Sequence, residues 1–254
     1  MALKAKSLFL YNYQITPLNA SIDFRNVAAG PVIQATLNLG YYSLTSLLNE
    51  IVRAMQFVDS AYTYTATADR TFASGTQNRV TISTNGTHLE LLFGSGPRSA
   101  SSVATLIGFN PTDQTGATTY TGTSTSGTIM IPNMVGYNYL GPEMMHKVFG
   151  ARNVSASGVK ESIVFSIQQF ITIQFKYEPY ANIISNWLPF SDWAIQQRLF
   201  DFTPDITNPT TFYEVTLDKT GADGNGMAQN YKEMLPDFPN LYDVGTLTMR
   251  INED

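Results

Sequence analysis

The sequence predicts a mainly β protein with antiparallel sheets in a β-sandwich-like arrangement, a small α+β module and few short helices. Segments that alternate apolar with polar residues recur along the 254-residue chain, as in AYTYTATAD (61–69), TTFYEVTLD (210–218) and GTLTMRIN (245–252). Such alternation is typical of strands with one buried face. Turn residues separate these segments, and one stretch, YYSLTSLLNEIVRAMQ (41–56), has the pattern of an ordinary amphipathic helix.

The first module, residues 1–140, opens with a predicted hairpin and this helix. Residues 21–39 alternate loosely around AAGP (28–31), where a turn is expected. The helix is predicted over 43–56, with the Ser43 hydroxyl accepting a hydrogen bond from an N–H of the first turn. Its apolar face follows spacings of three and four: Leu44, Leu47, Leu48, Ile51 and Met55. We expect this face to cover one side of a sheet.

The rest of the first module contains a predicted hairpin turn and a predicted arm. Asn85–Gly86 lies between alternating segments, and both residue types tolerate the positive φ angles of a type I′ turn. The segment PTDQTGATTYTGTSTSGT (111–128) is too rich in Thr and Gly for a core strand, so a surface arm or loop is expected. Its candidate assembly residues are Thr115, Thr118 and Tyr120.

The second module, residues 141–254, is predicted to be the β-sandwich-like domain. The stretch 159–178 is rich in β-branched residues and fits one long strand, or two strands bent in the middle. Pro189 is expected to stop a helix from beginning before it. The Gly-rich loop 219–230 contributes two further candidate assembly residues, Asp223 and Asn225.

The boundary between the modules is expected near GYNYLGPE (136–143), where turn residues cluster. Whether residues 1–20 pack with the second module is open at this stage. No internal repeat is evident in the sequence.

Composition excludes several classes of function. The net charge is −5 with no basic stripe, so nucleic-acid binding is not expected. Charged residues make up 14% of the chain, well below the usual quarter or so, which is consistent with a surface covered by other protein or with a neutral β domain. Cys is absent, which excludes disulfides and thiolate metal sites. No apolar run reaches the length of a signal peptide core or a membrane span, so synthesis in the cytosol is expected.

Motifs for catalysis, cofactors and metals are weak. His88 and His146 lie in different modules, and neither has an acid or Ser at a useful spacing. The loop FGSGPRSAS (93–101) has a G-x-G, but it lacks the ending of a phosphate-binding loop and the third Gly of a dinucleotide site. We therefore expect no enzyme activity, no cofactor and no bound metal.

Trp187, Asp192 and Trp193 offer an alternative, because carboxylates beside aromatic rings are what a sugar-binding cleft uses. The competing interpretation, which we favour, places both tryptophans in the core and the acids in turns. A carbohydrate-binding module thus stays as the second hypothesis.

The first module resembles a pattern in virion structural proteins of tailed bacteriophages. The matching stretches are YYSLTSLLNEIVRAM, YTYTATADRTFASGTQNRVTISTNG and LELLFGSGPRSASSVATLIGFNPTDQTGATTY. The second half resembles the closing β domain of distal-tail or minor tail proteins through ASGVKESIVFSIQQFITIQFKY and FDFTPDITNPTTFYEVTLD. A simple distal-tail protein would open with its ring-forming β domain, whereas here the α+β module comes first.

The resemblance implies a protein that assembles into symmetric rings through sheet edges and arms. We expect a ring-forming or adaptor component of the tail tip or baseplate, made in the host cytoplasm and located in the virion. Its partners would be itself, as a trimer or hexamer, and other tail proteins. A neck or capsid-decorating protein is the alternative placement within the particle.

Overall fold

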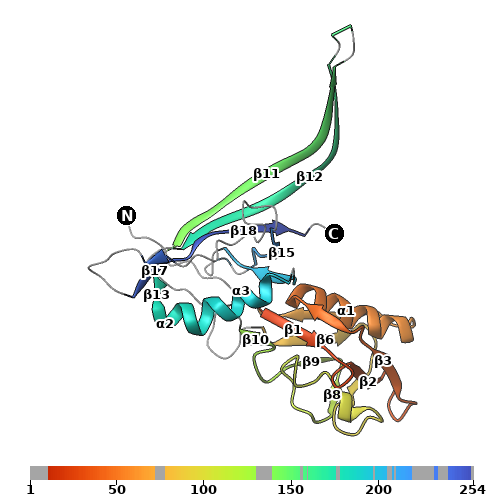
Figure 1. Cartoon of the computed structure of the whole chain (residues 1–254). Coiled ribbons are helices and arrows are strands. Elements are labelled where there is room, and N and C mark those ends of the chain that lie inside the picture. The colour runs from red at the N-terminus through yellow and green to blue at the C-terminus, as the bar shows by residue number, and fades with distance from the viewer. Residues whose placement is uncertain are drawn as a thin grey trace. The chain divides into compact units, whose positions relative to one another are not determined.

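The computed structural model has the predicted fold class: it is mainly β, with antiparallel sheets and short helices (Figure 1). It describes residues 11–71, 78–129, 139–154, 157–158, 160–175, 178–196, 198–204, 208, 210–218, 232–233 and 240–252. These fall into two compact units. The helix unit comprises the described residues of Phe9–Met130 and Leu199–Phe212, and the hairpin unit comprises those of Ile131–Arg198 and Tyr213–Asp254.

This division differs from the one expected from sequence in one segment, and it answers part of the open question about residues 1–20. Leu199–Phe212 belong to the helix unit, although they follow the expected boundary by some way. Residues 11–20 also belong to the helix unit, while residues 1–10 lie outside the described part of the chain. The chain therefore returns from the hairpin unit to complete the helix unit, which local turn signals cannot indicate.

The helix unit contains three small antiparallel sheets, ordered β10-β1-β4, β3-β2-β7-β8 and β5-β6-β9. Their strands, in chain order, are β1 (Tyr11–Ile15), β2 (Ser21–Arg25), β3 (Ile33–Thr36), β4 (Gly40–Tyr42), β5 (Tyr64–Ala68), β6 (Val80–Thr84), β7 (Leu89–Leu91), β8 (Gln114–Ala117), β9 (Thr119–Thr121) and β10 (Thr128–Ile129). The unit also holds α1 (Leu44–Val58), the 3-10 turn η1 (Ser99–Ser101) and β14 (Phe200–Phe202). The β2–β3 hairpin is the one predicted around 28–31.

Helix α1 begins as predicted. Ser43 is its N-cap: the Ser43 Oγ accepts from the Ser46 N–H at 3.0 Å, and the Ser46 Oγ accepts from the Ser43 N–H at 2.9 Å. The predicted apolar face is buried and packs against β3 and β5, which belong to different sheets. Glu50, which falls outside that apolar set, is buried as well and pairs with Arg53 at 2.6 Å.

The hairpin predicted at Asn85–Gly86 is wrong. Strand β6 pairs with β5 and β9, whereas β7 pairs with β2 and β8, so the chain crosses here from one sheet to another. Neither residue has a positive φ. Gly86 is instead required by close packing, because a Cβ there would lie 2.9 Å from the Tyr62 ring. Position 86 therefore does require a glycine, but the requirement comes from close packing and not from a tight turn.

The predicted arm at 111–128 is also wrong, because its segments are strands within the helix unit. Strand β8 pairs with β7, β9 with β6, and β10 with β1. Tyr120 is buried, and its hydroxyl donates to the Leu89 carbonyl at 2.8 Å and accepts from the Ala117 N–H at 2.8 Å. Thr115 is exposed and Thr118 half-buried on the same segment. Thr-rich strands with one anchoring aromatic can close a sheet edge without an apolar run.

The hairpin unit is built on one long β-ribbon. Its main sheet runs β11-β12-β18-β15, and a smaller sheet runs β13-β17-β16. The strands are β11 (Tyr139–Val154), β12 (Lys160–Phe175), β13 (Glu178–Pro179), β15 (Tyr213–Leu217), β16 (Lys232–Glu233), β17 (Leu241–Asp243) and β18 (Gly245–Ile251). The prediction of a long strand over 159–178 is thus confirmed by β12.

The pairing of β11 with β12 shifts register between Phe149 and Gly150. Gly150 is required by the close approach of the two strands here, because a Cβ at this position would lie 2.3 Å from the Ile163 carbonyl oxygen.

The expectation that Pro189 would prevent an earlier helix is wrong. A continuous helical run consists of α2 (Tyr180–Asn182), the π-helical segment η2 (Ile183–Trp187) and α3 (Leu188–Ala194). The Leu188 N–H bonds to the Ile183 carbonyl, a wider turn than in an α-helix. Such a π-helical turn changes the hydrogen-bond pattern just before the proline, which lacks an N–H of its own.

Replacing Tyr120 by Phe tests the corrected role of 111–128. The change leaves the buried Leu89 carbonyl without its hydroxyl donor, so we expect the free energy of unfolding to fall by about 1–3 kcal/mol. Urea denaturation followed by far-UV circular dichroism measures this. Thr115→Ala, at an exposed position of the same segment, should change it by less than about 0.5 kcal/mol. Equal stability of both variants would restore the arm interpretation.

Candidate functional site

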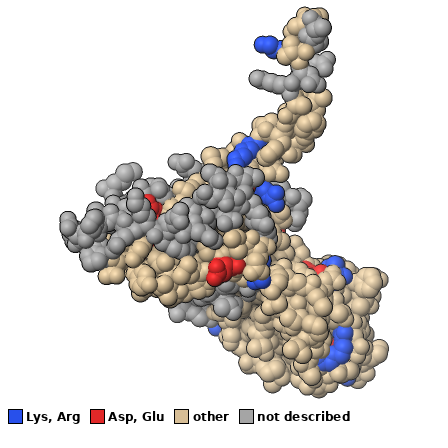
Figure 2. Space-filling view, viewed as in Figure 1, with Lys and Arg blue, Asp and Glu red and all other residues tan. Residues whose placement is uncertain are grey.

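The most unusual surface of the described residues is the distal part of the β11–β12 hairpin. In Figure 1 the two strands run on well past the end of β18. Large apolar side chains are exposed along this ribbon, Phe165 most of all at 70%; the others are Met144, Met145, Val148, Phe149, Val154, Ile163, Val164 and Ile167. We call this set the hairpin surface. In Figure 2 the described part of the ribbon is mostly tan, with Lys or Arg groups near its tip and toward its base.

The main-chain hydrogen-bonding groups along the edges of the hairpin are also largely unpaired among the described residues. Strand β18 pairs with β12 only over Phe170–Phe175, so the rest of β12 is paired with β11 alone. Among the described residues no strand pairs with the other edge of β11. A two-stranded ribbon with open edges is only marginally stable in water, and such edges readily pair with another chain.

At its base the ribbon is held to the rest of the hairpin unit. The Lys147 ammonium lies 3.3 Å from the Asp218 carboxylate and 4.2 Å from the centre of the Phe170 ring. Phe170, Ile171 and Ile173 are buried where β18 joins the sheet. The ribbon thus changes from a buried base to an exposed distal part along a single pair of strands.

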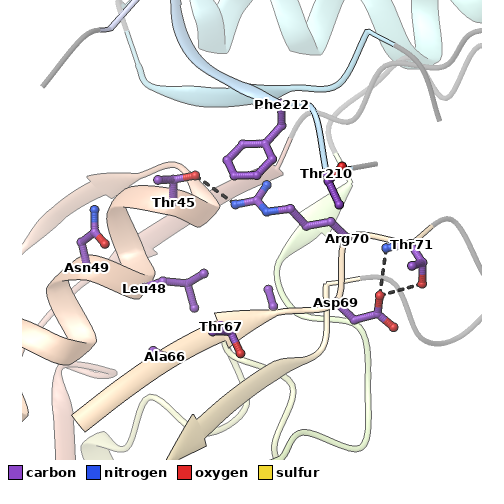
Figure 3. Close-up of a pocket in the computed structure, with 11 residues that line it drawn as sticks. Thr45, Leu48, Asn49, Ala66, Thr67, Asp69, Arg70, Thr71, Thr210 and Phe212 are labelled. Atoms are coloured by element: carbon purple, nitrogen blue, oxygen red, sulfur yellow. Dashed lines mark hydrogen bonds between the residues drawn. The ribbon is translucent and has the colours of Figure 1, made fainter. Parts of the chain in front are cut away.

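The helix unit contains a pocket of about 420 Å³ between α1 and β5. Figure 3 shows Thr45, Leu48 and Asn49 lining one side, Ala66 and Thr67 the other, and Arg70 with Phe212 closing one end. The charged lining groups are Arg70 and Asp69. The Asp69 carboxylate accepts from the Thr71 N–H at 2.9 Å and from the Thr71 hydroxyl at 2.6 Å.

Arg70 is part of a buried polar cluster. Its guanidinium donates to the Asp201 carboxylate at 2.7 Å and to the Thr45 hydroxyl at 2.9 Å. The Thr45 hydroxyl donates to the same carboxylate at 3.1 Å, and the guanidinium carbon lies 3.5 Å from the Phe212 ring centre. Arg70 is therefore committed to holding Leu199–Phe212 on the helix unit. No sequence signal links residues 131 positions apart, so this cluster was not predicted.

The structure does not support the sugar-binding residues proposed from sequence. Trp187 is fully buried and Trp193 is 5% exposed, so neither ring can stack on a sugar. Their rings pack around Phe190, with centroid distances of 6.2 Å and 6.5 Å. Asp192 is exposed on α3 without an exposed Trp beside it in that helix. The competing core interpretation of both tryptophans is confirmed.

The remaining candidate residues do not form a catalytic or metal site in the described part of the chain. The His88 Nε2 lies 3.2 Å from Glu90, which also pairs with Arg25 at 3.1 Å. His146 is exposed on β11. Within the described ranges no group of His, Cys, Asp and Glu could hold a metal ion. Asp223 and Asn225 lie outside the described residues.

The glycine loop at 93–101 is occupied by the protein's own carboxylate. Asp113 accepts from the N–H groups of Gly94 and Ser95 at 2.8 Å and 2.9 Å, and from the Ser95 hydroxyl at 2.5 Å. These hydrogen bonds outweigh the effect of burial and hold the pKa of Asp113 below its ordinary value. The amides that a phosphate would need are therefore already used.

Glu178 is a buried carboxyl in the hairpin unit. Its Oε2 accepts from the Asn182 amide at 2.7 Å. Burial raises the pKa of Glu178, and the hydrogen bonds from Asn182 and Trp187 offset only part of this effect. The arrangement anchors β13 to the start of the helical run that carries the aromatic core.

Comparison with known proteins gives no family for this chain. No protein-family model matches it, and no curated protein matches it. Within the described segments, no helix is both long enough and apolar enough to cross a bilayer.

Replacing Asp201 by Asn tests the buried cluster. The guanidinium of Arg70 would keep its burial but lose its counter-charge, so we expect the free energy of unfolding to fall by about 3 kcal/mol. Asp192→Asn, at an exposed position, should change it by less than about 0.5 kcal/mol. Chemical denaturation of both variants gives the comparison, and an unchanged Asp201→Asn protein would contradict the role given to this pair.

Glu178 predicts a pH dependence of stability. The pKa of Glu178 is raised above its ordinary value of 4.5 in the folded state. Its contribution to the free energy of unfolding is therefore fully favourable below pH 4.5, and it is lost as the pH rises through the folded-state pKa. Glu178→Gln should remove this loss and make the protein more stable than the wild type at neutral pH. Urea unfolding between about pH 4 and about pH 8 measures both curves. Parallel curves for the two proteins would show that the carboxyl is not stabilised in its neutral form.

Proposed function

We propose that the protein is a structural component of a tailed-bacteriophage virion, acting as a ring-forming or adaptor protein of the tail tip or baseplate. It works by self-assembly, as a trimer or hexamer, and by binding other tail proteins, without a chemical step. It is made in the host cytoplasm and resides in the virion. Neck or capsid-surface placement is the alternative within the same particle.

The hairpin surface is the observation that supports assembly most strongly. Monomeric soluble proteins rarely expose large contiguous apolar patches, and such patches usually mark sites of interaction. Here the apolar side chains lie on a ribbon whose edges, among the described strands, are also unpaired over most of its length. Association would bury the side chains and satisfy the main-chain groups together.

The low charge of the chain supports the same proposal. Charged residues account for 14% of the chain, so a large fraction of its surface can be covered without desolvating charges. Symmetric rings bury polar and apolar surface between identical subunits. A protein of this composition suits a position between neighbours.

A carbohydrate-binding module is the weaker alternative. It depended on Trp187 and Trp193, and both are buried. A sugar-binding function would need other exposed aromatic residues, and on the hairpin surface these are Phe149 and Phe165.

Shortening the hairpin tests the proposal. Replacing residues 149–166 by Asn-Gly joins Val148 to Ile167, which are direct cross-strand partners, and leaves all β12–β18 pairs in place. We expect the wild type to form a discrete oligomer and the shortened protein to be a folded monomer. Light scattering over a gel-filtration column gives both masses, and circular dichroism checks the fold.

Leu18→Ser is the matched control, because Leu18 is exposed but lies in the helix unit, away from the ribbon in sequence. It should leave the oligomer intact. A wild-type protein that stays monomeric at high concentration, or a shortened protein that assembles like the wild type, would overturn the proposal that the hairpin drives assembly.

A further inference from the structure

Strand β5 of the helix unit has one hydrogen-bonding edge that no described strand uses. It is the outermost strand of the sheet β5-β6-β9. Next to β5, the Thr63 carbonyl accepts from the Asn85 N–H at 3.0 Å, so the odd-numbered residues face β6. In an antiparallel ladder the residues between them point their N–H and C=O groups the other way. Those residues are Tyr64, Ala66 and Ala68.

The Gln56 side chain shows what this edge binds. It accepts from the Tyr64 N–H at 3.3 Å and donates to the Tyr62 carbonyl at 2.8 Å, so one amide group fills the place of a neighbouring peptide group. Beyond Gln56, no described residue hydrogen-bonds to the outward main-chain groups of Ala66 or Ala68. Both alanines line the pocket between α1 and β5, and Figure 3 shows Ala66 on the strand that faces α1.

The space beside this edge is elongated along α1. Thr45 and Asn49 line the pocket of about 420 Å³ from the helix side. Asn49 also lines a second hollow of about 470 Å³, which continues along the helix past Val52 to Gln56. These four residues recur at spacings of three and four, so one side of α1 forms a wall about three turns long. We call the open edge and the two hollows the α1–β5 groove; its length suits an extended segment, whereas a compact ligand would fill one hollow.

The lining of the pocket favours an uncharged occupant. Its apolar part consists of Leu48, Ala66, Ala68 and Phe212. Both charged lining groups already have partners in the chain: Arg70 pairs with Asp201. Asp69 accepts from the N–H and the hydroxyl of Thr71. A charged side chain entering the pocket would therefore lose its hydration without gaining a counter-charge, whereas an apolar side chain would gain from burial.

We infer that the α1–β5 groove binds an extended, uncharged peptide segment of another protein. The main chain of that segment pairs with Ala66 and Ala68, and its central apolar side chain enters the pocket. An extended main chain presents N–H and C=O groups at the spacing of the unpaired groups of β5. In recognition by strand addition, main-chain bonds supply affinity and pockets for alternate side chains supply specificity. This inference goes beyond the proposed function and does not use the hairpin surface.

The capped pentapeptide acetyl-Thr-Thr-Val-Thr-Thr-amide is the probe for the groove. Titration calorimetry with the full chain measures its affinity, and hydrogen exchange with residue resolution locates it. The Ala66 and Ala68 amides have no partner among the described residues, so we expect them to exchange fast in the free protein and slowly with the probe bound. Probes with Asp or Lys in place of Val should bind at least about tenfold more weakly. Charged probes that bind as tightly as the neutral one would overturn the inference.

Probes that carry a methyl group on one main-chain nitrogen test the pairing itself. Alternate residues of a strand point their N–H groups to the same side. Methylation should therefore weaken binding at alternate positions and leave the positions between them unaffected. Equal affinity of all the methylated probes would refute strand addition. These probes leave the protein unchanged, so their result does not depend on the folding of a variant.

Ala66→Pro is the matched change in the protein. It removes the outward N–H, while the odd-numbered residues keep their bonds to β6; edge strands tolerate proline where the N–H faces outward. We expect the affinity for the neutral probe to fall at least about tenfold. Leu18→Ser, at an exposed residue outside the lining of both hollows, should bind like the wild type. A folded Ala66→Pro protein that also binds like the wild type would contradict the inference.

The outcomes separate this inference from the proposed function. The mass in solution tests the hairpin, whereas the probes test the groove. If no probe protects the Ala66 and Ala68 amides, the groove is refuted as a peptide site, whether or not the wild type assembles. Protection of the same amides on raising the protein concentration without a probe would make a second copy the occupant, and would overturn the assignment to another protein.

Discussion

The helix unit depends on the burial of one apolar face of α1. Each of its three sheets has only three or four strands, and a sheet must pack its apolar face against another element. Helix α1 contacts strands of all three: β1 and β4 of one, β3 of another and β5 of the third. Its buried side chains thus give three small sheets a common core. This also explains why one ordinary helix stands in a chain of short strands.

In the hairpin unit, apolar residues of the same kind are buried at one end of the ribbon and exposed at the other. Near β18 the ribbon buries Phe170, Ile171 and Ile173, and farther out it exposes residues of the same type. The difference is the number of neighbouring strands, because among the described strands β18 pairs only with the base of the ribbon. A second molecule could supply the missing cover. Under the proposed function, assembly would continue the sheet.

Sequence patterns succeeded where they describe a residue's own backbone or face. The Ser43 cap, the apolar face of α1 and the length of β12 are of this kind. They failed where the partner decides the outcome. The Asn85–Gly86 signal indicated a tight turn, but the flanking strands find partners in different sheets. The Thr/Gly-rich segment 111–128 looked too polar for a core, yet Tyr120 anchors it through one hydroxyl. Pro189 lies within a helical run because a π-helical turn precedes it.

By itself the sequence determined the mainly antiparallel β class, the place of the helix and the low surface charge, because these follow from periodicity, capping and composition. Only the tertiary structure decided which strands share a sheet, that Trp187 and Trp193 are buried, and that Arg70 meets Asp201. It alone decided that the hairpin surface is exposed. The physical reason is that burial and hydrogen-bond partnership belong to pairs of distant residues, whereas a sequence pattern reports the preferences of neighbours.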